Sequence, residues 1–416
     1  MYSMFLERRN HGPHSQRLTA LRVIRAIRSG AVAGSLQMRC DLIDPDPSPA
    51  TRWTKRRLAS ATAFLQPALG DPSKRPLDVL VSSMDKRLQA QCAHSTFRTH
   101  DYPPLSFIDL GNGIAASGPE LTFVELARIM DPAVHLLLGM ELCGRFSRDA
   151  TNPRSGEIAY GLPPVTSVER LRAFAHQAHW IRGAEQALAT IDAIVENAWS
   201  PMEALVAALI VLPHSSLGYD LWPITLNPRK ALGERLGSTS DAQSRVPDIM
   251  FAGTSVGLNY DGEDHFRLQD IADAAMALDQ NPQDAMCAKE LETALAEARA
   301  RIVADKRRDR DLMAMGLSVF SITKEDLEEP GGFDRVMLQV IEAIEASGTR
   351  NLCEVKRDLE RRGLAAARQD FIWSLMPGAR AMEARRRLEL RRRTEAYEIE
   401  FELQEGQVKI VSTREL

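Results

Sequence analysis

The side chains of this chain that could do chemistry are concentrated in one stretch, Arg245–His265, which reads RVPDIMFAGTSVGLNYDGEDH. Two runs of apolar and β-branched residues, Val246–Phe251 and Val256–Asp261, flank the four residues Ala252–Ser255. Runs of this kind, bounded by Gly and Ser, are typical of two strands joined as a β-hairpin. We therefore expect a hairpin to carry the site.

The register of this hairpin decides which polar side chains meet. If Phe251 faces Val256, counting outward places Asp248 opposite Asn259. Asp261 shares their face, because side chains along a strand alternate with a period of two. Opposed Cβ atoms lie about 4.5–5.5 Å apart, so two carboxylates and an amide oxygen would converge. Hard divalent cations such as Mg²⁺ bind oxygen clusters of this kind, and the spacing predicts a metal site there.

Composition limits the classes of function. At 416 residues the chain is long enough for two or three domains. With a net charge of −4 and a pI near 6.2, the whole molecule is not a polycation. Any contact with nucleic acid must therefore come from a local basic patch.

The sequence favours a cytoplasmic protein without a membrane anchor. Its first residues, MYSMFLERRN, lack the apolar core of a signal peptide. The longest apolar run, Ala204–Pro213, is about half a membrane span. Five dispersed cysteines without a Cys-x-x-Cys pair fit reduced thiols better than disulfides or a zinc site.

Residues 1–165 are expected to form an N-terminal α+β domain. Residues 15–29 repeat Leu, Ile and Arg at helical spacing and belong either to a DNA-binding winged-helix head or to a solvated amphipathic helix. Residues 77–82 (LDVLVS) predict a strand. The segment 105–117 (LSFIDLGNGIAAS) predicts two strands around a Gly-Asn-Gly turn, and helices follow from Ser117 through Leu126 and over 133–143.

Helix is then expected over 167–197, and Ser200-Pro-Met-Glu203 opens a new apolar helix. Ser at the cap, Pro at the first position and Glu at the third form a capping box, which would occupy Glu203 structurally. Alternatively, Glu203 adds a carboxylate to the Asp248 cluster.

These motifs, taken in order, resemble a known family. Ser-Pro-Met-Glu, Val-Pro-Asp at 246–248 and Tyr-Asp-Gly at 260–262 with His265 are similar to the endonuclease-like family related to very-short-patch-repair nucleases, in the PD-(D/E)xK superfamily. Residues 305–312 fit its D-x-x-R-D-x-x-L helix, and 316–323 resemble its closing strand. Residues 77–143 also resemble the region that precedes such domains in proteins related to abortive-infection type IV antitoxins.

The resemblance implies a restriction-endonuclease-like fold, with a mixed sheet flanked by helices, over residues 166–330, including a helical insertion at 266–304 that compact members lack. It also implies phosphodiester hydrolysis with Mg²⁺ and a role in defence or repair. Asp248 and Asp261 would be metal ligands, supported by Glu203 and Asn259, and His265 would act as base or phosphate contact.

Two departures from the family open an alternative function. Asn259 stands where the family has Glu, and Asp261 takes the place of the superfamily lysine. An Asn oxygen can ligate a hard cation but brings no charge. The alternative is a catalytically impaired nuclease fold that serves as a DNA-binding or antitoxin-like regulatory module.

Basic residues near the site supply the expected contact with DNA. They lie in one segment and are Lys306, Arg307, Arg308 and Arg310. They alternate with Asp305, Asp309 and Asp311, so a solvated, salt-bridged helix is the other interpretation. DNA is thus the expected partner, with a protein partner or a homodimer as a further option.

Residues 331–416 are expected to form a helical C-terminal extension with a terminal hairpin. Helices are predicted near 333–346 and 352–362. Residues 380–393 (RAMEARRRLELRRR) are rich in arginine, and the acidic segment YEIEFELQEGQVKIV follows with a turn at Glu405-Gly406. The arginines either track phosphates or pair with carboxylates of the hairpin or of a neighbouring helix, and the second interpretation is favoured.

Overall fold

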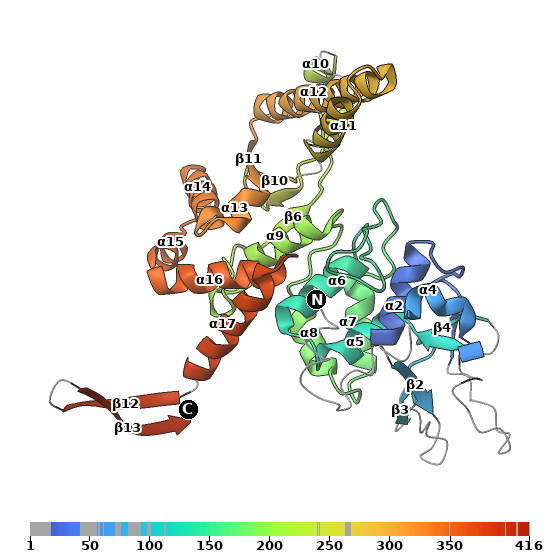
Figure 1. Cartoon of the computed structure of the whole chain (residues 1–416). Coiled ribbons are helices and arrows are strands. Elements are labelled where there is room, and N and C mark those ends of the chain that lie inside the picture. Colours follow the sequence, from blue (N-terminus) through green and yellow to red (C-terminus); the bar gives the residue numbers. More distant parts are fainter. Residues whose placement is uncertain are drawn as a thin grey trace. The chain divides into compact units, whose positions relative to one another are not determined.

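A computed structural model of the chain describes residues 18–41, 62–70, 76–81, 93–97, 101–111, 114–238, 242–262, 268–348, 350–395, 397–404 and 407–415, together with residues 56, 59, 60 and 240. These residues form helices and small sheets, which confirms the mixed α/β class expected from the sequence. The chain divides into two compact units (Figure 1). The first comprises Met1–Leu212 and Ile224–Asn227, and the second comprises Pro213–Pro223 and Pro228–Leu416.

Five of the described strands of the first unit form two small sheets. In one of them, β4 (Phe107–Asp109) pairs antiparallel with β5 (Ala115–Ser117) and with β1 (Arg39–Cys40). The two strands expected within 105–117 are therefore confirmed, although Asn112 and Gly113 of the turn lie outside the described residues. The predicted strand at 77–82 is β2 (Leu77–Val81), which pairs in parallel with β3 (Ala93–Phe97).

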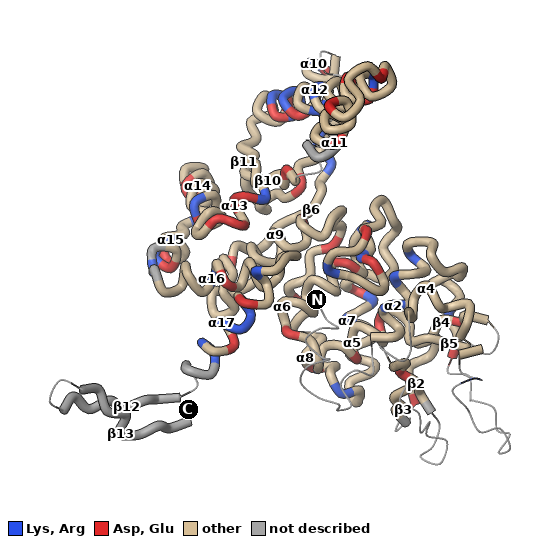
Figure 2. The backbone as a smooth tube through the Cα atoms, in the orientation of Figure 1, with Lys and Arg blue, Asp and Glu red and all other residues tan. Residues whose placement is uncertain are grey.

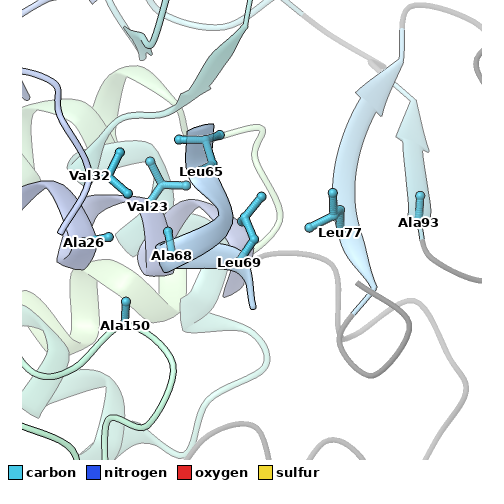
Figure 3. Packing of buried hydrophobic residues seen from close by; sticks show 9 residues of the cluster. All are labelled: Val23, Ala26, Val32, Leu65, Ala68, Leu69, Leu77, Ala93 and Ala150. Atoms are coloured by element: carbon cyan, nitrogen blue, oxygen red, sulfur yellow. The ribbon is translucent and has the colours of Figure 1, made fainter. Parts of the chain in front are cut away.

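Helices supply most of the core of the first unit. The helix expected within 15–29 is α2 (Leu18–Arg28), and it contacts α4 (Gln66–Leu69) through a small apolar cluster. Figure 3 shows side chains of both helices in that cluster. Its buried members are Val23, Ala26, Val32, Leu65, Ala68, Leu69, Leu77, Ala93 and Ala150. The remaining elements are η2 (Ala63–Leu65), α5 (Pro119–Ala127), α6 (Pro132–Leu142), α7 (Val168–Gln177), α8 (Ala184–Ile191), α9 (Pro201–Val211) and β6 (Ile224–Leu226).

The segment 167–197 differs from the continuous helix that was expected, because it forms two helices, α7 and α8. Gly183 begins α8 in a left-handed conformation with φ 109°. A Cβ at this position would collide with the carbonyl oxygen of Val124. The break therefore depends on a glycine that adopts a positive φ and lets another backbone segment approach closely.

A sheet with mixed strand directions forms the centre of the second unit. Strand β9 (Ile249–Phe251) pairs antiparallel with β10 (Val256–Asp261), and β10 pairs in parallel with β11 (Ser318–Thr323). The parallel pairing requires a long connection, which the chain makes with two helices. Thr323 ends β11 and caps the next helix with a capping box.

The two connecting helices form an arm, here called the helical arm. It consists of α11 (Leu268–Gln280) and the 30-residue α12 (Ala285–Ala314), which lie against each other (Figure 1). The segment 266–304 was expected to be helical, and α12 continues without a break into the 305–312 motif. All of α12 is described, and Leu312 is its one fully buried residue.

The C-terminal part of the second unit is helical and ends in a hairpin. Helices α14 (Gly332–Ala346) and α15 (Cys353–Glu360) occupy the predicted ranges, whereas α16 (Arg362–Leu375) was not predicted. The terminal strands β12 (Tyr397–Gln404) and β13 (Gln407–Glu415) pair antiparallel, as expected. The other elements are η4 (His214–Ser216), β7 (Lys230–Ala231), α10 (Glu234–Gly237), β8 (Ser244–Arg245), α13 (Lys324–Glu328) and α17 (Arg380–Glu395).

The arginines of α17 make contacts within the protein. Arg387 lies 2.6 Å from Asp370 of α16 and 2.9 Å from Glu383 of its own helix. Arg385 donates to the carbonyl oxygen of Ser374, and Arg391 donates to that of Gly363. The interpretation that this block pairs with carboxylates of a neighbouring helix is confirmed for Arg387.

Among the described helices, none is both long enough and apolar enough to span a membrane.

Candidate functional site at the end of the β9–β10 hairpin

The register of the central hairpin is the predicted one. Met250 pairs with Gly257 and Ile249 pairs with Leu258, and the next step along both strands places Asp248 opposite Asn259. Strand β9 begins at Ile249 rather than at Val246, so Asp248 lies one residue before the regular ladder. Beyond Ile249 the pairing continues through side chains, because the Asn259 amide bonds to the Asp248 backbone and the Asp248 carboxylate bonds to the Tyr260 backbone.

The side chains of Asp248 and Asn259 each accept a hydrogen bond from the backbone of the opposite side of the hairpin. The Asn259 Oδ1 atom accepts a hydrogen bond from the backbone N–H of Asp248 at 3.1 Å. The Asp248 Oδ2 atom accepts one from the backbone N–H of Tyr260 at 2.7 Å. Asn259 is 1% exposed, and so its amide serves a buried backbone donor. This role requires an acceptor oxygen at position 259 and explains locally why a short amide stands there.

Asp261 lies on the same face of β10 as Asn259 and is paired with an arginine of the helical arm. The Arg308 Nη2 atom lies 3.3 Å from the Asp261 carboxylate. The same guanidinium lies 3.7 Å from Asp305 and 3.8 Å from Asp309, so three carboxylates surround it. A cation of the protein therefore stands beside the carboxylate that was expected to bind a metal ion.

The C-terminal end of α12 is held against the sheet by contacts that explain the D-x-x-R-D-x-x-L pattern. Asp305, Arg308 and Leu312 are three and four residues apart and share one helical face, with Leu312 buried. Arg245 holds the same end of the helix, because its Nη2 atom lies 2.6 Å from Asp311. The sequence motif identified the helix but not the partner of Arg308. The shared face of Asp305 and Arg308 was the signal that Arg308 points inward.

Glu203 lies in the first unit, whereas Asp248, Asn259 and Asp261 lie in the second. Ser200 caps α9 by accepting from the Glu203 N–H at 3.1 Å, as predicted. The Glu203 carboxylate accepts from the Trp199 N–H at 2.9 Å and from the Asn227 side chain at 2.8 Å. Only one of the two hydrogen bonds of a capping box is therefore formed, because the Glu203 carboxylate accepts from the Trp199 N–H instead of from that of Ser200, the cap residue.

The environment of Glu203 shifts its titration. Burial raises the pKa of Glu203, although the hydrogen bonds from Asn227, Trp199 and Ser200 oppose that shift. The carboxylate therefore already serves backbone and amide donors within its own unit.

The other predicted site residues fall into two groups. His265 lies outside the described residues. Lys306, Arg307 and Arg310 are exposed on α12, one residue or more away from the inward-pointing Arg308. Figure 2 shows Lys and Arg residues interleaved with Asp and Glu residues along α12.

The residues of this site do not fit Mg²⁺ in the arrangement that they adopt. Asp248 and Asn259 each direct an oxygen at a backbone N–H, and Asp261 faces Arg308. A magnesium ion needs oxygens from several ligands in near-octahedral geometry, so binding would require Arg308 to leave Asp261. Within the described part of the chain, no group of three or more His, Cys, Asp and Glu side chains is placed to hold a metal ion.

Comparisons with protein-family models, with curated proteins and with solved structures gave no match to this chain.

Proposed function

We propose that the second unit is a restriction-endonuclease-like domain that binds DNA without cleaving it, in the manner of an antitoxin-like regulatory module. The carrying observation is the contact between Arg308 and Asp261, because it places a protein cation where a nuclease would need a metal ion. The fold supports the proposal, since the β9–β10 hairpin is followed through helices by the parallel strand β11.

The loss of catalysis follows from the use of the three polar side chains. Hydrolysis of a phosphodiester by this class requires a metal ion that polarises the phosphate and activates a water. Asn259 brings no charge and its oxygen holds the Asp248 N–H. Asp261 is paired with the Arg308 guanidinium, which would have to move away before a divalent cation could bind this carboxylate.

DNA binding is carried by the exposed basic residues next to the Arg308–Asp261 contact. Lys306, Arg307 and Arg310 surround Arg308 along the helix and face solvent. Positive side chains that reach phosphates bind DNA with little regard to sequence and with strong dependence on salt. The Arg308 contact also fixes the helix on the sheet, which presents these three residues on a rigid support.

The test compares two variants with equal loss of charge. The site variant replaces Lys306, Arg307 and Arg310 with Gln. The control variant replaces three other exposed arginines with Gln, namely Arg335 in α14, Arg357 in α15 and Arg361 directly after α15. In fluorescence anisotropy with a duplex DNA, the site variant should bind more weakly, with the salt slope reduced by about 0.9 for each lost contact. The control should retain both affinity and slope. Equal losses in the two variants, or no binding by the parent protein, would refute DNA binding at α12.

A metal-dependent DNA endonuclease is the second candidate function, because the register does bring Asp248, Asn259 and Asp261 to one end of the hairpin. Incubation of plasmid with the protein and Mg²⁺ or Mn²⁺ separates the two candidates. Our proposal expects no nicking. Nicking that disappears in Asp248→Ala would establish the endonuclease instead.

A further inference from the structure

The helical arm exposes an apolar stripe that the described structure does not cover. Leu295 is 47% exposed and Ile302 is 44% exposed, although both are large aliphatic residues in the middle of α12. With about 100° per residue, residues seven apart lie on nearly the same line of a helix. Ala288, Leu295 and Ile302 therefore form one line, which differs from the face that α12 presents to α11 and the sheet.

Charged residues lie beside this line, with the acidic ones before Leu295 and the basic ones after it. From the start of the helix the exposed stripe contains Asp284, Ala288, Glu292, Leu295, Arg299, Ile302 and Lys306. The residues before Leu295 are acidic or small, and those after it are basic or apolar. The stripe is therefore complementary to itself when it is read in the opposite direction.

We propose that α12 is an interaction surface for a second copy of this chain, which docks its own α12 antiparallel across a two-fold axis at Leu295. The two Leu295 side chains then meet at the axis, and Ala288 of each copy lies opposite Ile302 of the other. A small residue facing a large one allows two helices to pack closely. Isologous contacts of this kind are the usual way in which soluble proteins form dimers.

The same register pairs opposite charges on both sides of the axis. Asp284 lies level with Lys306 of the second copy, and Glu292 lies one residue from the level of Arg299, within reach of its long side chain. Each pair occurs twice, because the axis repeats it. A parallel arrangement would instead place Glu292 beside Glu292 and Arg299 beside Arg299. The order of charges thus selects the antiparallel dimer over the parallel one.

Charge reversal at one pair tests the register directly. Glu292→Arg and Arg299→Glu each create like-charge contacts on both sides of the axis, so each should raise the Kd of the dimer by about tenfold or more at low salt. The double variant restores opposite charges and should recover the affinity of the parent protein. Sedimentation velocity over a range of protein concentrations measures all four proteins.

An apolar variant and its control complete the experiment. Leu295→Asp places two carboxylates at the axis and should give monomers. Ala304→Asp adds the same side chain at an exposed position half a turn around the helix and should leave the dimer intact. None of these substitutions changes Lys306, Arg307, Arg308 or Arg310, so the dimer is tested without altering the basic residues of the proposed DNA contact, although Lys306 belongs to both proposed surfaces.

Two outcomes would overturn the proposal. The parent protein could remain monomeric while Leu295→Asp lowers the melting temperature, which would mean that another part of the same chain covers the stripe. Alternatively, a dimer could form that neither the single reversals nor Leu295→Asp weaken, which would place the interface elsewhere.

Discussion

At the scale of single residues, the end of the β9–β10 hairpin depends on one amide. Asn259 accepts from the Asp248 N–H while Asp248 accepts from the Tyr260 N–H, so the two residues replace the hydrogen bonds that a longer ladder would supply. Because Asn259 is almost fully buried, water does not offer a ready substitute for its oxygen. The amide is therefore a structural requirement of this sheet.

Removal of that acceptor should destabilise the second unit. Asn259→Leu keeps the branched shape of the side chain but leaves the Asp248 N–H without its partner, and we expect a loss of about 1–3 kcal/mol in the free energy of unfolding. Urea denaturation followed by circular dichroism measures the loss. A loss in Asn259→Leu no larger than that of an exposed control such as Ala304→Ser would show that the hydrogen bond contributes little.

A charged acceptor at the same position tests the metal-dependent alternative. Asn259→Glu adds a carboxylate beside Asp248 and Asp261, and without a metal ion we expect a lower melting temperature because of burial and repulsion. If the cluster has the geometry of a metal site, millimolar Mg²⁺ should raise the melting temperature of this variant more than that of the parent protein. Our proposal expects equal, small shifts in both proteins and no plasmid nicking. A selective shift accompanied by nicking would favour the endonuclease.

The sequence could predict which residues meet here but not how they bond. Strand periodicity and the length of the Ala252–Ser255 connection were enough to place Asp248 opposite Asn259. Which hydrogen-bond donor each oxygen takes depends on atomic positions that periodicity does not contain. The partner of Asp261, Arg308, is also distant in sequence and reaches it only through the path of α12.

At the scale of elements, α2 is joined to the β2–β3 pair by hydrogen bonds between Thr19 in its first turn and Asp78 of β2. The Asp78 Oδ2 atom accepts from the Thr19 N–H at 3.2 Å and from the Thr19 hydroxyl at 3.0 Å. The Thr19 hydroxyl in turn accepts from the Asp78 N–H at 3.0 Å. Burial raises the pKa of Asp78 from 3.8 to about 7, although the bonds from Thr19 oppose the shift.

This shift predicts that the first unit becomes less stable as pH rises toward neutrality. Between pH 4 and 7 the folded protein retains a proton on Asp78 that the unfolded chain has released, so the free energy of unfolding falls with rising pH in that window and levels off above it. The slope is at most about 1.4 kcal/mol per pH unit. Thermal melts from pH 5 to pH 8 measure it. Asp78→Asn should flatten the profile, and an unchanged slope in that variant would assign the effect to another group.

Helix prediction succeeded where capping and periodicity agree, as in α9 with Ser200 at its cap. It failed in 167–197, where apolar periodicity continues but Gly183 allows a break that only tertiary contact with Val124 makes necessary. The short β9 is a similar case, since β-branched composition extends to Val246 while side-chain bonds end the ladder at Ile249. Tertiary structure overrides local preference at such positions.

At the scale of the whole molecule, one helix carries both proposals. The stripe from Asp284 to Lys306 would join two chains, and Arg308, two residues further on, holds the helix to Asp261. A dimer would also hold two sets of exposed cations in one assembly, and linked sites bind a long duplex more tightly than either alone. Lys306 belongs to both proposed surfaces, whereas Leu295 belongs to the dimer alone and Arg307 and Arg310 belong to the DNA contact alone.

The parallel pairing of β10 with β11 also has a consequence for the order in which the second unit folds. Val256 pairs with Ser318 across an intervening segment of about sixty residues, so closing this ladder first would cost considerable chain entropy. Helices α11 and α12 have mainly local contacts and can form early. Once they have formed, the chain between the two strands is a short, stiff connection, and the antiparallel β9–β10 hairpin provides a template on which β11 can dock. We therefore expect early formation of the helical arm to accelerate the pairing of β10 with β11, which would otherwise be slow because the two strands are far apart in the sequence.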